Sequence, residues 1–190
     1  MQSTNLKVVS TQIRDILIET KAPANAVWKR ILGVIGLTIS DLASLDFESE
    51  SQLLIKQVKN ILILEPAPVD ISFLYFGLFE LLDRTRDTSS RARVGFYFAG
   101  GTAPKPEVAL DRGDLSYLPN ERFLQSRILN RIRELGSDDV ESRQIFDYAI
   151  LLGAAGVLAK SVGANIGINV PTYVGFDSGD YALVSRGHDE

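Results

Sequence analysis

Four aspartates of the chain fall in two copies of a short pattern that places carboxylates close together. Asp111 and Asp114 belong to Asp-Arg-Gly-Asp, while Asp177 and Asp180 belong to Asp-Ser-Gly-Asp. Carboxylate oxygens are the ligands that hard cations such as Mg²⁺ and Ca²⁺ take, and paired carboxylates can move protons during hydrolysis. One function that the pattern suggests is therefore a divalent-metal-dependent hydrolase that uses these four residues.

Each copy also stands between two short apolar runs, as the turn of a β-hairpin does. Residues 108–110 and 115–117 flank the first copy, and residues 173–176 and 181–184 flank the second. Glycine supplies the left-handed residue of a three-residue hairpin loop, and aspartate bonds its own turn amides. Neither copy completes a calcium-binding loop with its closing glutamate. We favour the hairpin interpretation and predict no metal site.

Arginines form the second group of interest. Residues 84–135 hold ten basic residues against six acidic ones, which gives a net charge of +4. The whole chain carries −4, so the remaining residues carry −8. The planar fork of arginine suits phosphate and carboxylate partners. The segment is therefore interpreted as a protein interface, as a site for an anionic ligand or nucleic acid, or as a solvated surface that pairs with acidic residues. The candidate binding residues are Arg84, Arg86, Arg91, Arg93, Arg127 and Arg131.

Several kinds of chemistry are missing from the composition. The 190 residues contain no cysteine and one histidine, His188. This excludes disulfides, thiolate zinc sites and iron–sulfur clusters, and it makes a histidine-based triad unfavourable. No Gly-x-Ser-x-Gly or Ser-x-x-Lys motif occurs either. These absences argue against an enzyme, and we predict no catalytic residue and no cofactor.

Apolar spacing and capping residues predict a mainly helical chain. A capping box at Ser49 and Gln52 opens one predicted helix, and Asp70 caps another. The last helix combines small and aliphatic residues and is expected to lie buried at the centre of the core. The predicted helices span residues 4–19, 24–35, 41–45, 49–64, 70–82, 120–135 and 138–162.

The remaining segments predict a small sheet. Val94–Phe98 alternates like a strand, and the two hairpins would complete an antiparallel sheet with it. The fold class expected is α+β and predominantly helical, with six or seven helices. We expect a single domain, residues 1–190: a helical half (1–83), an Arg-rich segment with strand and hairpin (84–118), two helices (119–163) and a C-terminal hairpin (164–187).

Taken together, these features favour a non-enzymatic cytoplasmic protein that acts through protein interaction or assembly. The partner expected is another protein or a second copy of the chain. Binding of phosphate or nucleic acid through residues 84–135 is the first alternative, and the metal-dependent hydrolase is the second. No membrane contact is expected, because the longest apolar run, Tyr148–Ala159, is shorter than the about 20 residues that a membrane-spanning helix needs.

Overall fold

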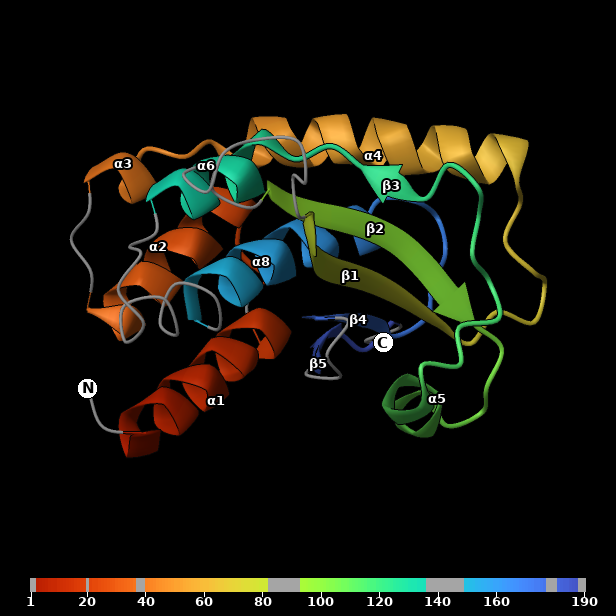
Figure 1. The fold of residues 1–190 in the computed structure, drawn as a ribbon, viewed down its shortest axis with the longest axis horizontal. Coiled ribbons are helices and arrows are strands. Elements are labelled where there is room, and N and C mark those ends of the chain that lie inside the picture. Colours follow the sequence, from red (N-terminus) through yellow and green to blue (C-terminus); the bar gives the residue numbers. More distant parts are fainter. Residues whose placement is uncertain are drawn as a thin grey trace.

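The computed structural model describes residues 3–19, 21–36, 40–81, 93–135, 149–176 and 181–187. These ranges contain seven helices and five strands, which confirms the α+β class (Figure 1). The helices are α1 (Ser3–Glu19), α2 (Ala24–Ile35), α3 (Ser40–Ala43), α4 (Phe47–Leu64), α5 (Pro106–Arg112), α6 (Arg127–Leu135) and α8 (Leu152–Gly163). The strands are β1 (Phe73–Leu81), β2 (Arg93–Gly101), β3 (Phe123–Leu124), β4 (Thr172–Phe176) and β5 (Tyr181–Ser185).

The five strands form one mixed sheet in the order β3-β2-β1-β4-β5. Strand β1 pairs antiparallel with β2 and parallel with β4, while β3 and β5 add antiparallel edges. The prediction of a small antiparallel sheet was therefore wrong in size and in direction. The main cause is β1, the central strand, which lies where a helix over residues 70–82 was predicted.

The burial of β1 on both faces explains why it was predicted to be a helix. Leu74, Phe76 and Leu78 point to one face of the sheet, Phe73 and Tyr75 point to the other, and all five are buried. A strand that is covered on both faces is a continuous apolar run, which periodicity alone does not distinguish from a buried helix. Leu74 and Leu78 satisfy the helical spacing and the strand alternation alike.

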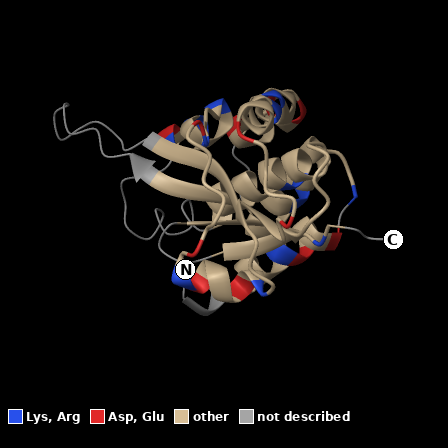
Figure 2. Ribbon diagram, turned by 90° about the vertical axis from the view of Figure 1, so that its right-hand side faces the viewer, with Lys and Arg blue, Asp and Glu red and all other residues tan. Residues whose placement is uncertain are grey.

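Helices α1, α2, α4, α6 and α8 pack around the first face of the sheet and enclose the main hydrophobic core. Helix α8 lies in the middle of this layer, and all its residues from Leu152 to Ala159 are buried. This confirms a central buried helix, although residues 138–148 of the predicted helix lie outside the described residues. Figure 2 shows that charged residues lie on helices and loops, while the described strands are almost wholly uncharged.

The ends of the first helices follow from local capping. Helix α2 has the predicted bounds, and Gly36 ends it with the left-handed φ of 72°. Helix α4 begins two residues before the predicted start, because Asp46 is its cap. The carboxylate of Asp46 accepts hydrogen bonds from the Ser49 hydroxyl at 2.5 Å and the Ser49 amide at 3.2 Å. These bonds lower the pKa of Asp46 from its ordinary value.

The second face of the sheet is aromatic and is covered in part by α5. Its buried cluster consists of Phe73, Tyr75, Tyr97, Ala99, Ala109, Leu110 and Tyr173. Two glycines face aromatic residues on the neighbouring strand: Gly77 lies opposite Tyr97, and Gly95 lies opposite Phe79. A β-carbon built on Gly77 would lie 2.0 Å from the Tyr97 ring. The rings therefore lie directly on the glycine backbone.

The first predicted hairpin is replaced by helix α5, and the second is confirmed. Pro106 begins α5, and Gly113 ends it in the left-handed conformation with a φ of 66°. The pattern Asp-Arg-Gly-Asp thus contains a helix end instead of a hairpin turn, which a proline at the first helical position and a glycine after the last both favour. Strands β4 and β5 do pair as an antiparallel hairpin.

The helix predicted for residues 120–135 begins only at Arg127. Residues 123–124 form strand β3 instead, so that Leu124 pairs with Phe96 at the edge of the sheet. The Ser126 hydroxyl accepts the amide of Leu129 at 3.2 Å and caps α6. The segment still has one apolar side, since Leu124, Ile128 and Ile132 are buried.

A tyrosine–carboxylate contact fixes α5 on the second face. The Tyr173 hydroxyl donates to the Glu107 carboxylate at 2.6 Å, and the Tyr181 hydroxyl donates to the Glu107 carbonyl at 3.3 Å. The bond from Tyr173 lowers the pKa of Glu107. Burial, followed by the bond to Glu107, raises the pKa of Tyr173 well above its ordinary value.

This contact gives a prediction about alkaline stability. The folded state holds the Tyr173 phenol protonated, whereas the unfolded chain ionises it near its ordinary pKa of about 10. Its contribution is therefore complete below about pH 10 and is lost as the pH rises further. Urea unfolding between pH 8 and about pH 11 should show a steeper loss of stability in the wild type than in Tyr173→Phe. An equal pH dependence of the free energy of unfolding in the two proteins would contradict this prediction.

A candidate interaction surface along helix α4 and strand β3

The structure describes three of the six arginines that the sequence indicated. Arg84, Arg86 and Arg91 lie outside the described residues, and Arg93 is the first residue of β2. Arg127 and Arg131 are exposed on α6, one helical turn apart. The described part of the chain therefore shows two of the six side chains, both on the outer side of α6.

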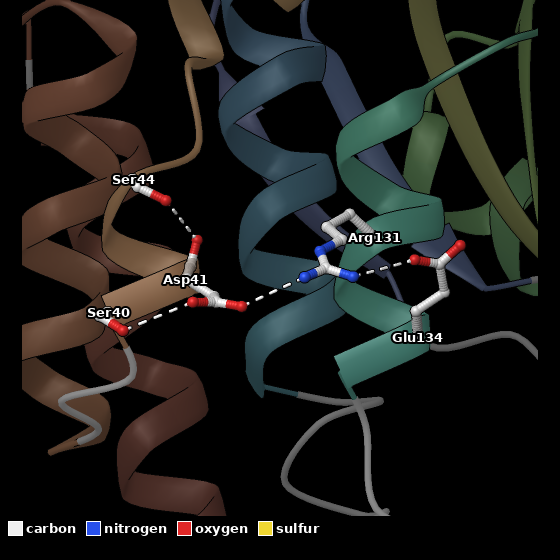
Figure 3. Close-up of polar contacts among 5 residues, drawn as sticks. All are labelled: Ser40, Asp41, Ser44, Arg131 and Glu134. Carbon is white, nitrogen blue, oxygen red and sulfur yellow. Dashed lines mark hydrogen bonds and ion pairs between the residues drawn. The ribbon is translucent and has the colours of Figure 1, made fainter.

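Arg131 is engaged by acidic neighbours. Its guanidinium bonds the Asp41 carboxylate at 3.1 Å and the Glu134 carboxylate at 3.3 Å (Figure 3). Ser40 donates to the same Asp41 carboxylate, and Ser44 donates to the Asp41 carbonyl, so the acidic partner is itself held in place. All three ionic side chains are about half exposed, which makes these pairs weak contributors to stability. Arg131 serves to join α6 to α3.

The four aspartates are not shown together. Asp111 lies on α5 and Asp114 follows its end, whereas Asp177 and Asp180 lie outside the described residues. Within the part of the chain that the structure describes, no three acidic or histidine residues form a group that could hold a metal ion.

Helix α4 organises the neighbouring segment of residues 117–127 through three polar side chains. Glu50 is buried, and its carboxylate accepts the Arg127 amide at 2.6 Å, so it caps α6 from another helix. Gln57 both donates to and accepts from the backbone of Gln125. These contacts hold the segment that carries β3, at the edge of the sheet, against α4 (Figure 1).

Glu65, just after α4, provides the third connection. Its carboxylate accepts the backbone amide and the side-chain amide of Asn120 at 2.8 and 3.1 Å. Its carbonyl accepts the Tyr117 hydroxyl at 2.6 Å. Burial and the nearby Glu65 charge raise the pKa of Tyr117, which therefore stays a neutral donor. Segment 117–125 is thus anchored to α4 at both of its ends.

Exposed apolar side chains gather on this anchored part of the molecule. Among the residues whose side chains are described, eight large apolar ones are exposed, and six belong to α4, the loop after it or segment 118–123. We call these six the α4–β3 surface: Leu53, Ile63, Leu64, Val69, Leu118 and Phe123. Leu64 is 72% exposed and Phe123 is 55% exposed. Contiguous exposed apolar patches mark binding surfaces more often than scattered residues do.

Cations outnumber carboxylates near this surface by four to three. Lys56 and Lys59 are exposed on α4, and no acidic residue occurs between Ser51 and Leu64. The Arg122 guanidinium lies 4.7 Å above the centre of the Phe123 ring. Arg127 adds a further exposed cation at the start of α6. Three acidic residues lie at the margin: Asp70 and Glu121 are exposed, and Glu65 is half-buried with its carboxylate bonded to Asn120.

The sequence predicted a charged residue of this surface but none of its apolar residues. Arg127 was among the predicted residues, but no apolar residue of α4 was. The available signal was in α4 itself: Leu54, Val58 and Ile61 form its buried side, whereas Leu53 and Leu64 fall outside that stripe.

The chain matches no known family model, no curated protein and no solved structure. None of the described helices is both long and apolar enough to cross a membrane.

Proposed function

We propose that this protein acts by binding another protein through the α4–β3 surface. The observation that carries the proposal is the grouping of exposed apolar side chains on a segment that polar contacts hold rigid. A preorganised surface loses little conformational entropy on binding. Burying a leucine or phenylalanine side chain of this kind contributes about 1.5–3 kcal/mol.

The chemistry of the surface also describes its partner. Lys56, Lys59, Arg122 and Arg127 surround the apolar residues, so the complementary surface is apolar with carboxylates at its rim. Aromatic and arginine side chains are enriched at the energetic centres of protein interfaces, and Arg122 on Phe123 is such a pair. The partner expected is an acidic protein with an exposed apolar stripe.

Charge-introducing variants test this proposal. Leu64→Asp and Phe123→Asp should each weaken capture of the partner by at least about tenfold, because either places an unpaired charge in an apolar contact. Val8→Asp is the matched control, since Val8 is 52% exposed but lies on α1. Quantitative pull-down from lysate, followed by binding measurements with the purified partner, compares the three.

The outcome has a clear interpretation. Leu64→Asp and Val8→Asp change exposed residues, so the free energy of unfolding should shift by no more than about 0.5 kcal/mol. Phe123 also packs against the Phe79 ring, so the unfolding curve of Phe123→Asp is measured to confirm that this variant is folded. A partner that is retained by Leu64→Asp and Phe123→Asp, or lost equally with Val8→Asp, contradicts the proposal. Light scattering then tells whether the partner is a second copy of the chain.

A second candidate function is the binding of single-stranded nucleic acid at the same edge. Arg122 over the exposed Phe123 ring, with Arg127 nearby, supplies stacking and phosphate contacts. This function requires an affinity that falls steeply with salt and falls further in Arg127→Ala. Binding to an oligonucleotide that is absent, or unaffected by salt, removes it.

A further inference from the structure

Arg122, the residue directly before β3, is fixed through its backbone and its side chain alike. Its backbone amide and its guanidinium Nη1 both donate to the Pro119 carbonyl, each at 3.2 Å. Its own carbonyl accepts the Phe98 amide of β2 at 2.9 Å. Pro119 is buried, and the proline ring fixes its φ, so the acceptor itself has little freedom. The guanidinium is therefore positioned before any partner arrives.

The Phe123 ring supports the same guanidinium from another side. The guanidinium carbon lies 4.7 Å from the centre of this ring. The ring in turn lies 5.6 Å from the Phe79 ring of β1, centre to centre. Planar guanidinium groups lie well on aromatic faces, where an ammonium does not gain the same contact. Arg122 and Phe123 thus form one ordered unit of a cation and an apolar ring at the edge of the sheet.

Both supports are neutral, so they position the guanidinium without cancelling its charge. The two ion pairs found among the described residues both involve Arg131, and neither involves Arg122. The nearby Glu65 carboxylate is bonded to Asn120. Within the described part of the chain, the printed sequence neighbour Glu121 forms no ion pair with Arg122 either. Arg122 is therefore a preorganised cation.

The remaining donors of Arg122 define the group that it can bind. A guanidinium carries N–H donors on each of its nitrogens. Among the described residues, none accepts a hydrogen bond from Nη2 or Nε of Arg122. These two nitrogens form a planar fork that matches the two oxygens of a carboxylate. A neutral amide of the same shape gains less from this fork, because it carries no charge.

We propose that Arg122 is the specificity-determining residue of the α4–β3 surface and binds a carboxylate that lies next to an apolar side chain of the partner. This role rests on the proposed function, and it assigns the selection of an acidic partner to one residue. Leu118 and Phe123 are 49% and 55% exposed on the same segment, so apolar surface lies close to the fork. Apolar surface beside a cation favours a protein carboxylate over the phosphates of a nucleic acid.

Peptides selected from a random library displayed on phage provide the probe. Selection uses the full chain, and peptides that still bind Leu64→Asp are discarded, so those that are kept bind the α4–β3 surface. These peptides should carry Asp or Glu next to an aliphatic or aromatic residue. A selection that leaves no peptide contradicts the proposed function itself. Peptides that are kept but lack such an acidic residue contradict only the role of Arg122.

Variants of both molecules then measure the pair by fluorescence anisotropy of labelled peptide. Changing the acidic residue of the peptide to Asn or Gln should weaken binding by about tenfold, as loss of a charge-assisted contact does. Arg122→Gln should weaken binding of the acidic peptide by the same factor. It should change binding of the amide peptide by less than about twofold, because the two groups act as a pair. Arg122→Lys should lose most of the affinity as well, since it lacks the planar fork.

Arg112→Gln is the matched control, because Arg112 is exposed on α5 and lies outside the α4–β3 surface. The peptide changes leave the protein untouched, so they test the proposal even if Arg122→Gln does not fold. An equal loss in Arg112→Gln, full affinity in Arg122→Lys, or independent effects of the protein and peptide changes overturn the proposal. So does binding of a single-stranded oligonucleotide that depends on Arg122 when binding of the acidic peptides does not.

Discussion

Replacement of Trp28 by alanine is expected to lower the free energy of unfolding by about 4 kcal/mol. Trp28 is 1% exposed, and its ring lies 4.8 Å from that of Phe47 at the start of α4. Its indole N–H donates to the Leu42 carbonyl at 2.7 Å. One side chain thus joins α2 to α3 and α4, and its removal leaves both a cavity and a buried carbonyl without its shortest hydrogen bond.

Urea unfolding followed by circular dichroism measures this loss. Fluorescence is unsuitable for the variant, because Trp28 is the single tryptophan of the chain. Trp28→Phe is the matched control: it keeps an aromatic ring against Phe47 but removes the N–H donor, so it should cost about 1–3 kcal/mol. A loss below about 1 kcal/mol in Trp28→Ala would contradict the role assigned to this residue.

The second large effect is expected at Gly77. The Tyr97 ring occupies the position that a β-carbon on Gly77 would take. Gly77→Ala therefore forces the ring away from the sheet, where Tyr97 also contacts Phe79 and Tyr75. Such overpacking costs about 2–3 kcal/mol, even though alanine suits a strand better than glycine does.

A double-mutant cycle distinguishes this close contact from a general sensitivity of β1. In a Tyr97→Ala background the ring is gone, and Gly77→Ala should cost little or stabilise the sheet. The two substitutions should therefore show a coupling energy of at least about 1 kcal/mol. Strictly additive losses would show that the ring over Gly77 does not limit the size of the residue there.

The helices that sequence reasoning predicted well are those with polar ends and one apolar side. Helix α2 ends at Gly36, where the left-handed conformation is local in origin, and α1 has one periodic apolar side. The small error at α4 is of the same kind: Asp46 and Ser49 are both cap-forming residues, and only the structure shows which one accepts.

The largest error came from a segment whose burial is decided by distant residues. Nothing local in residues 73–79 shows that β2 and β4 will cover both edges of β1 and that two apolar layers will cover both its faces. The same limitation applies to β3, whose two residues pair with Phe96 and Tyr97. Strand pairing is a tertiary contact, so it overrides local periodicity.

The candidate sites were likewise predicted only in part, where the signal is local in the sequence. Arg127 was predicted because its charge and helical spacing are visible in the sequence. The contact by which Glu50 caps α6 joins residues 77 positions apart, so it forms only when the chain has folded. The exposure of Leu64 likewise depends on which side of α4 faces the sheet.

The contacts of α1 have a consequence for how the protein is made. Arg14 bonds the Tyr181 carbonyl, and Lys160 bonds the end of α1, so its partners are 167 and 143 residues away. During synthesis α1 leaves the ribosome well before α8 and β5 are translated. Ile13 and Leu17 on the apolar side of α1 pack on Gly153 and Gly156 of α8, so this part of the helix stays uncovered until α8 has been made. Such distant pairing slows folding and leaves apolar surface of this helix exposed until the contacts form.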